Sequence, residues 1–114
     1  MAKKNSSMPQ VFAVRFTVKC GTNDSLSGMI QTEDQEEQER RVLLDDSGIA
    51  TMKLPAGTYT FVWAVKMTPI QRHRYSIKAE QMPDDGGDPV ELRKRPTEQT
   101  TTNGEDVGFD DFKL

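Results

Sequence analysis

Alternation of apolar and polar positions over residues 11–20 gives the clearest structural signal in this chain. Side chains of a strand point alternately to opposite faces, so this pattern predicts a strand with one face buried. A second alternation, over residues 58–67, carries Tyr59, Phe61 and Trp63 on one face. The intervening positions are mostly small or apolar, and we therefore expect a central strand that is buried on both faces.

Four further segments carry shorter strand patterns. Most of them are flanked by clusters of Gly, Pro, Asn and Asp, the residues that favour tight turns. The segments are residues 25–32, 40–44, 49–54 and 72–79. Short strands separated by such turns predict a meander, and we expect an all-β fold: one small antiparallel β-sandwich of about six or seven strands.

The two ends of the chain differ in composition from the strand region. Residues 1–9 are polar, residues 10–81 hold the expected sandwich, and residues 82–114 begin with a linker rich in Pro, Asp and Gly. Residues 90–95 fit a charged edge strand, whereas residues 96–106 contain no apolar side chain. We therefore predict a flexible N-terminus and a mostly disordered acidic tail.

Residues 107–114 regain apolar side chains among acidic ones. One helical turn would present Phe109 and Phe112 on the same face, beside Asp110 and Asp111. Three interpretations stay open: a short motif that folds onto a partner, a segment that docks on its own sandwich, and simple disorder. We expect disorder in the isolated protein, with these four residues as the candidate partner-binding site.

Composition argues against most catalytic chemistry. The chain has a single His and a single Cys, which cannot supply a usual zinc site or an internal disulfide. No glycine-rich phosphate loop is present, and no nucleophile motif surrounds any Ser. We expect Cys20 to be a packed thiol and His73 to be partly exposed, rather than a catalytic pair. The sequence thus predicts a non-enzymatic protein that needs no metal or cofactor.

The sequence also bears on location. No stretch approaches the roughly 20 apolar residues that a membrane-spanning helix needs. Residues 1–10 have basic side chains but lack the apolar core of a signal peptide. The expected location is therefore the cytoplasm, with no membrane partner.

Nucleic acid is the alternative partner. With 15 basic and 18 acidic residues, and a net charge of -3, the chain is unlike a general nucleic-acid binder. A local exception is the segment 71–78, where strand alternation places Arg72, Arg74 and Lys78 on one face. Tyr75 offers a stacking ring, but it falls on the opposite face, where we expect it to fill the core.

One segment points to a known family. Residues 45–62 read Asp-Asp-Ser-Gly-Ile-Ala-Thr-Met-Lys-Leu-Pro-Ala-Gly-Thr-Tyr-Thr-Phe-Val. This string resembles the repeated unit of prealbumin-like β-sandwiches, such as carboxypeptidase regulatory-type and collagen-adhesin B-type domains. The resemblance implies a hairpin in which Pro55 sets the turn entry, Gly57 takes a positive φ and Tyr59 packs on the core. It implies no catalytic residue.

Together these features predict a non-enzymatic protein-interaction or accessory module whose protein partner the sequence does not name. The alternative function is a small nucleic-acid-binding protein that uses the basic strand face of residues 72–78.

Overall fold

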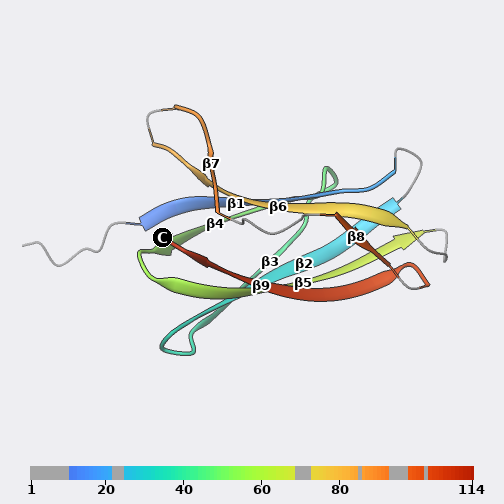
Figure 1. Cartoon of the computed structure of the whole chain (residues 1–114), viewed down its shortest axis with the longest axis horizontal. Helices are drawn as coiled ribbons and strands as arrows, with labels where there is room; N and C mark the ends of the chain where they lie inside the picture. Colours follow the sequence, from blue (N-terminus) through green and yellow to red (C-terminus); the bar gives the residue numbers. More distant parts are fainter. Residues whose placement is uncertain (1–10, 22–24, 69–72, 85, 93–97, 102) are drawn as a thin grey trace, which may run out of the picture.

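The computed structural model describes residues 11–21, 25–68, 73–84, 86–92, 98–101 and 103–114. Within them the chain forms nine strands and no helix (Figure 1). The strands are β1 (Val11–Lys19), β2 (Ser25–Asp34), β3 (Glu39–Leu43), β4 (Ile49–Pro55), β5 (Thr58–Thr68), β6 (Arg74–Met82), β7 (Val90–Glu91), β8 (Glu98–Thr100) and β9 (Glu105–Lys113). The expected flexible N-terminus at residues 1–9 lies outside the described residues.

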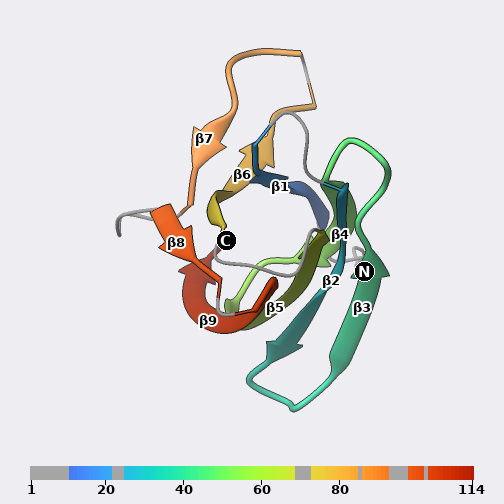
Figure 2. The same ribbon diagram turned by 90° about the vertical axis from the view of Figure 1, so that its right-hand side faces the viewer.

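Two antiparallel sheets pack face to face, which confirms the predicted all-β sandwich. The five-stranded sheet has the order β4-β1-β6-β7, and β8 also pairs with β6. The four-stranded sheet has the order β3-β2-β5-β9. Figure 2 views the molecule from its end and shows the two layers curving around a shared interior.

Alternate residues of the strands fill this interior. On β1, Val14, Phe16 and Val18 are at most 1% exposed, as the alternation predicts. The ring of Phe16 lies 5.1 Å from that of Phe61 on β5 and 6.0 Å from that of Phe112 on β9, measured between centroids. Full burial of one such side chain contributes about 1.5–3 kcal/mol, so this aromatic cluster is a main source of the attraction between the sheets.

Several connections between consecutive strands pass from one sheet to the other. β3 and β5 belong to the four-stranded sheet, whereas β4, which lies between them in sequence, belongs to the five-stranded sheet. The predicted meander is therefore wrong at this point, and so is the hairpin that the family resemblance implies. The turn before β5 is an arch between sheets. Its local features are as expected, since Gly57 has a φ of +153° and Tyr59 is buried.

β5 is the central strand of the four-stranded sheet, between β2 and β9. Its inward residues Tyr59, Phe61 and Trp63 are at most 3% exposed, which confirms the predicted phase of the strand. Burial on both faces is wrong, because Thr60 and Lys66 are exposed on the outer face. Only one face of this sheet packs against the second layer.

β9 contradicts the predicted disordered tail. The whole strand pairs with β5, so the sandwich extends far beyond the expected boundary at residue 81. Phe112 is 4% exposed and packs in the aromatic cluster. Gly108 lies against the indole of Trp63, where an added Cβ would overlap ring atom Cζ2. Of the three interpretations of this segment, docking on its own sandwich agrees with the structure.

A hydrogen-bonded chain ties the start of β9 to both sheets. The indole N–H of Trp63 donates to the hydroxyl of Tyr75 over 2.8 Å, and this hydroxyl donates to the carboxylate of Asp106. The three residues come from β5, β6 and β9. A buried polar group that loses its partner costs about 1–3 kcal/mol, so each member supports the others.

The stretch between β6 and β9 agrees with the sequence in part. β7 begins the expected edge strand but has only two residues, and residues 93–97 lie outside the described residues. β8 falls within residues 96–106, where disorder was expected, and this prediction is wrong. The described residues accordingly hold nine strands rather than the expected six or seven.

Candidate functional site

The outer face of the four-stranded sheet carries a continuous apolar row. The pairing register places one residue from each of its four strands side by side: Leu43, Met29, Ala64 and Val107. In the next row, Val62 of β5 faces Phe109 of β9. These six residues are called the apolar face below.

Three residues of the apolar face are exposed to solvent, and Met29, Val62 and Ala64 are half-buried between them. Leu43 is 74% exposed, and Val107 and Phe109 are each 69% exposed. A shallow hollow of about 450 Å³ lies along the row, between Met29 and Leu43 on one side and Val107 on the other. Single exposed apolar residues are ordinary, but a contiguous patch on a soluble domain marks an interaction surface. The geometry therefore fits contact with another apolar protein surface.

The structure separates the four residues expected to bind a partner. Phe109 lies on the apolar face, whereas the ring of Phe112 stacks on Tyr59 in the core at a centroid distance of 5.3 Å. The helical turn that would place both rings on one face is not formed, since the segment is a strand and successive residues point to opposite sides.

The two acidic residues of this set make hydrogen bonds within the protein. Asp110 is 5% exposed, and its carboxylate accepts the backbone N–H of Asp111 over 2.8 Å. The carboxylate of Asp111 accepts the hydroxyl of Thr60 on β5 over 2.9 Å. The contact of Asp111 with Thr60 ties β9 to β5. Of the four residues, Phe109 and Asp111 are exposed on the outer face, whereas Asp110 and Phe112 are buried.

Most of the apolar face was missed from the sequence. The sequence indicates only Phe109 as a site residue and none of the other five, which are Leu43, Met29, Val62, Ala64 and Val107. The sequence did hold an indication of this face, because Val62 and Ala64 are apolar at the alternate positions of residues 58–67, where an exposed strand face would normally be polar. The same pattern also fits a strand that is buried on both faces, and the periodicity alone does not distinguish the two cases.

The opposite face of the sandwich is basic. Of the residues proposed for nucleic-acid binding, Arg74 and Lys78 are exposed on β6, and Arg72 lies outside the described residues. The register brings further basic side chains to the same outer face: Arg15 and Lys19 of β1 and Lys53 of β4.

Part of this basic charge is neutralised by a single carboxylate. Glu80 lies 3.1 Å from the guanidinium of Arg15 and 3.9 Å from the ammonium of Lys78. The ring of Tyr75 is 2% exposed and points into the core, as expected. Among the described residues, no aromatic side chain is exposed on this face for a base to stack on.

His73 is buried and Cys20 is half-buried. His73 is 5% exposed, so the expected partial exposure is wrong. Its backbone N–H donates to the hydroxyl of Thr101, and the N–H of Thr101 donates to the carbonyl of His73, each over 2.8 Å. Cys20 is half-buried against the hydrophobic core. The described residues contain no group of three or more His, Cys, Asp or Glu that could hold a metal ion.

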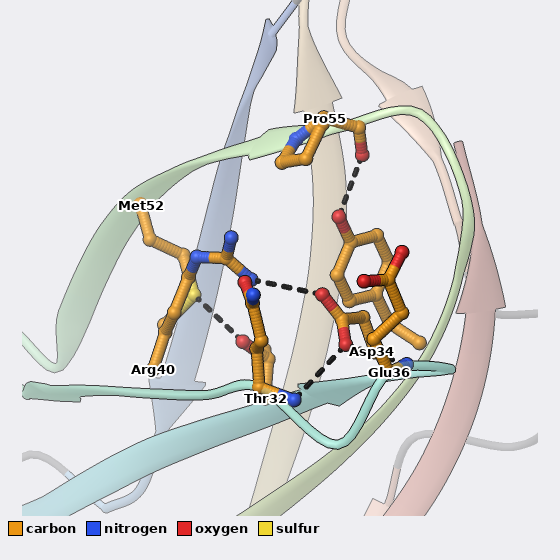
Figure 3. A network of polar contacts seen from close by, with 8 residues as sticks. Thr32, Asp34, Glu36, Arg40, Met52 and Pro55 are labelled. Carbon is orange, nitrogen blue, oxygen red and sulfur yellow. Dashed lines mark hydrogen bonds and ion pairs between the residues drawn. The ribbon is translucent and has the colours of Figure 1, made fainter.

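Asp34, at the end of β2, accepts two backbone hydrogen bonds from the turn that follows it (Figure 3). It accepts the backbone N–H of Gln38 over 3.0 Å and that of Glu36 over 2.9 Å, and the guanidinium of Arg40 lies 3.6 Å away. The N–H of Gln38, followed by that of Glu36 and by Arg40, holds the pKa of Asp34 below its ordinary value of 3.8. These contacts close the β2–β3 hairpin. They give the Asp34 carboxylate a structural role in the turn.

A tyrosine beside this turn closes the neighbouring arch. The hydroxyl of Tyr59 donates to the carbonyl of Pro55 over 2.7 Å, and burial raises the pKa of this hydroxyl. Figure 3 also shows the hydroxyl of Thr32 directed at the sulfur of Met52, 3.4 Å away. The printed contacts at this end of the sandwich join the β2–β3 hairpin and the arch between β4 and β5 to neighbouring parts of the fold.

Comparison with known proteins adds no relative. No family model matches the chain, and no curated protein and no solved structure matches it. The prealbumin-like resemblance of residues 45–62 accordingly stays a prediction. In the described part of the chain, no helix is long and apolar enough to cross a membrane.

Proposed function

We propose that this protein is a non-enzymatic protein-interaction module that binds a partner through the apolar face of its four-stranded sheet. The observation that carries the proposal is the row Leu43, Met29, Ala64 and Val107, two of whose members are 74% and 69% exposed. Covering such side chains with apolar surface releases about 25 cal/mol per Å². The partner is a protein that presents apolar side chains of its own.

Charged residues beside the apolar row would orient this partner. Glu39 and Arg41 on β3 and Lys66 on β5 are exposed around the apolar row. A polar rim around an apolar centre is the usual composition of a protein interface, and mixed charges select a partner more than they tighten its binding.

The proposal is tested by placing charge on the apolar face. Leu43→Lys with Val107→Lys should leave the melting temperature nearly unchanged, because both positions are exposed. The double variant should lose a stoichiometric partner that the unmodified protein captures from its native extract. Thr51→Lys on the exposed outer face of β4 is the matched control and should retain it. Equal capture by all three proteins would contradict the proposal.

The basic face supports nucleic-acid binding as a second proposal. Five basic side chains share this face: Arg15, Lys19, Lys53, Arg74 and Lys78. Contacts with phosphates alone predict weak binding of single-stranded RNA that falls steeply as salt is raised. Replacing Lys19 and Lys78 by Glu should abolish it, while the Leu43→Lys, Val107→Lys variant should keep it. If the protein does not bind single-stranded RNA even at low salt, this second function is excluded.

A further inference from the structure

The outer edge of β9 is a second, separate surface that can bind protein. β9 ends the four-stranded sheet, and among the described residues no strand pairs with its outer edge. We propose that β9 pairs antiparallel with β9 of a second copy of this chain. The resulting symmetric dimer would join two four-stranded sheets into one. This inference goes beyond the proposed function, because it concerns the edge of the sheet rather than its face.

The pairing with β5 determines which backbone groups β9 offers. Gly57 and Leu114 exchange both backbone hydrogen bonds, over 2.9 and 3.2 Å, and the N–H of Met67 donates to the carbonyl of Gly104. Antiparallel ladders alternate between bonded and non-bonded pairs. The even-numbered residues of β9 therefore bond to β5, and the odd-numbered ones direct their N–H and C=O groups outward. These are Glu105, Val107, Phe109, Asp111 and Lys113.

The sequence of β9 is complementary to itself in one antiparallel register. When Phe109 lies opposite Phe109 of the second copy, Glu105 lies opposite Lys113 at both ends of the strand pair. Facing residues of antiparallel strands interact directly, and opposite charges or paired aromatic rings stabilise the pair. The two-fold axis would pass beside the two Phe109 rings, which are 69% exposed in the single chain.

The neighbouring register is unfavourable. A shift that places Val107 opposite Phe109 also places Glu105 opposite Asp111, twice, and like charges at facing positions are destabilising. The opposite shift, which places Phe109 opposite Asp111, loses both Glu105–Lys113 pairs and sets Asp110 opposite Asp110. Charge therefore favours the register centred on Phe109. That register also extends the apolar face, since Val107 and Phe109 of both copies lie on the same side of the joined sheet.

One contact limits the strength of the dimer. The N–H of Asp111 already donates to the carboxylate of Asp110, so it is not free to bond across the new ladder. The opposing bond, from the N–H of Val107 to the carbonyl of Asp111, stays available. Side-chain caps of this kind restrain edge strands from indefinite association. The structure accordingly fits a reversible, concentration-dependent dimer.

Charge reversal provides the test, by sedimentation equilibrium of the full-length protein over a range of concentrations. Glu105→Lys alone places Lys opposite Lys, and Lys113→Glu alone places Glu opposite Glu. Each should weaken the dimer at least about tenfold, since two favourable pairs become repulsive. An equimolar mixture of the two variants restores both opposite-charge pairs and should form a heterodimer. Glu39→Lys, exposed on the far edge strand β3, is the control and should dimerise like the unmodified protein.

Circular dichroism and thermal melting of each variant show whether it is folded. If a charge-reversed chain does not fold, Glu105→Gln and Lys113→Gln replace the pair and should weaken the dimer by a smaller factor. A protein that is monomeric at every concentration overturns the inference, as does a dimer that neither reversal weakens or that the mixture does not restore. The two proposals can fail separately. If the unmodified protein is monomeric and the Leu43→Lys, Val107→Lys variant still loses the captured partner, the proposed function holds and the dimer inference is false.

Discussion

At the scale of single residues, β9 depends on a close contact between a glycine and an indole. Gly108 pairs with Trp63 across the ladder, and the space that a side chain would need is filled by the indole ring. The same indole donates to Tyr75, so it cannot move aside without losing a buried hydrogen bond. A glycine in the middle of a strand ordinarily weakens it, and here the close approach explains its presence.

Gly108→Ala should therefore destabilise the protein by about 1–3 kcal/mol, the usual cost of overpacking a well-filled site. Chemical denaturation followed by Trp63 fluorescence measures this cost. Val107→Ala, one residue earlier and exposed, is the control and should change the free energy of unfolding by less than about 0.5 kcal/mol. Equal stabilities would show that residue 108 does not approach the indole.

Asp34 makes the stability of the β2–β3 hairpin depend on pH. Its pKa in the folded state is lowered, so the carboxylate contributes stability above its unfolded pKa of about 3.8. That contribution is lost as the pH falls through the folded-state value. Asp34→Asn should lower the melting temperature at neutral pH, and the difference from the unmodified protein should shrink below about pH 4. A difference that is constant from pH 7 to pH 2 would contradict this role.

At the scale of elements, β9 shows how one strand serves both the core and the surface. Phe112 lies in the aromatic cluster with Tyr59 and Phe61, whereas Phe109 lies outside on the apolar face. The inward face of β9 is not uniformly apolar, because it also holds Asp106 and Asp110. Acidic residues at inward positions lower the apparent hydrophobicity of the segment, although hydrogen bonds to Tyr75 and to the backbone satisfy them.

The two phenylalanines of β9 form a matched pair for a test of this arrangement. Phe112→Ala should cost about 3–5 kcal/mol, because it empties a buried aromatic site. Phe109→Ala should cost less than about 0.5 kcal/mol, because the side chain is 69% exposed. Urea denaturation of both variants gives the comparison. If both substitutions change the free energy of unfolding only slightly, residues 107–114 are disordered, as the sequence alone predicts.

At the scale of the whole molecule, the sandwich presents two unlike outer faces. The four-stranded sheet exposes the apolar face, and the five-stranded sheet exposes a basic one. Because strands are covered by the second layer on one side only, each sheet is free to carry a different surface chemistry. The C-terminal strand is an integral part of this architecture, since it covers one edge of β5 and places Phe112 between the layers.

Removal of residues 105–114 should consequently abolish cooperative folding. The deletion exposes the edge of the central strand β5 and removes Phe112 from the core. Thermal melting followed by circular dichroism should lose its sharp transition, and the fluorescence of Trp63 should shift to the red of the native protein. A shortened chain that melts like the full-length protein would show that the sandwich ends before β9.

The sequence predicted the elements far better than the site. Six strands between residues 11 and 82 were located from local alternation, and the inward phase of β1 and β5 was correct. Of the candidate site, only Phe109 was named in advance. Its partners on the apolar face come from β2, β3 and β5, and strand pairing brings them together from distant parts of the chain.

The sequence by itself determined the β character of this protein, because the period of two that a strand requires is written in neighbouring residues. It also determined the inward phase of the best-patterned strands. The tertiary structure decided which sheet each strand joins, since an arch and a hairpin use the same turn residues. It also decided that residues 105–113 form a strand. Their Asp and Gly residues predict disorder, but in the folded chain Trp63, Tyr75 and β5 provide the contacts that order them.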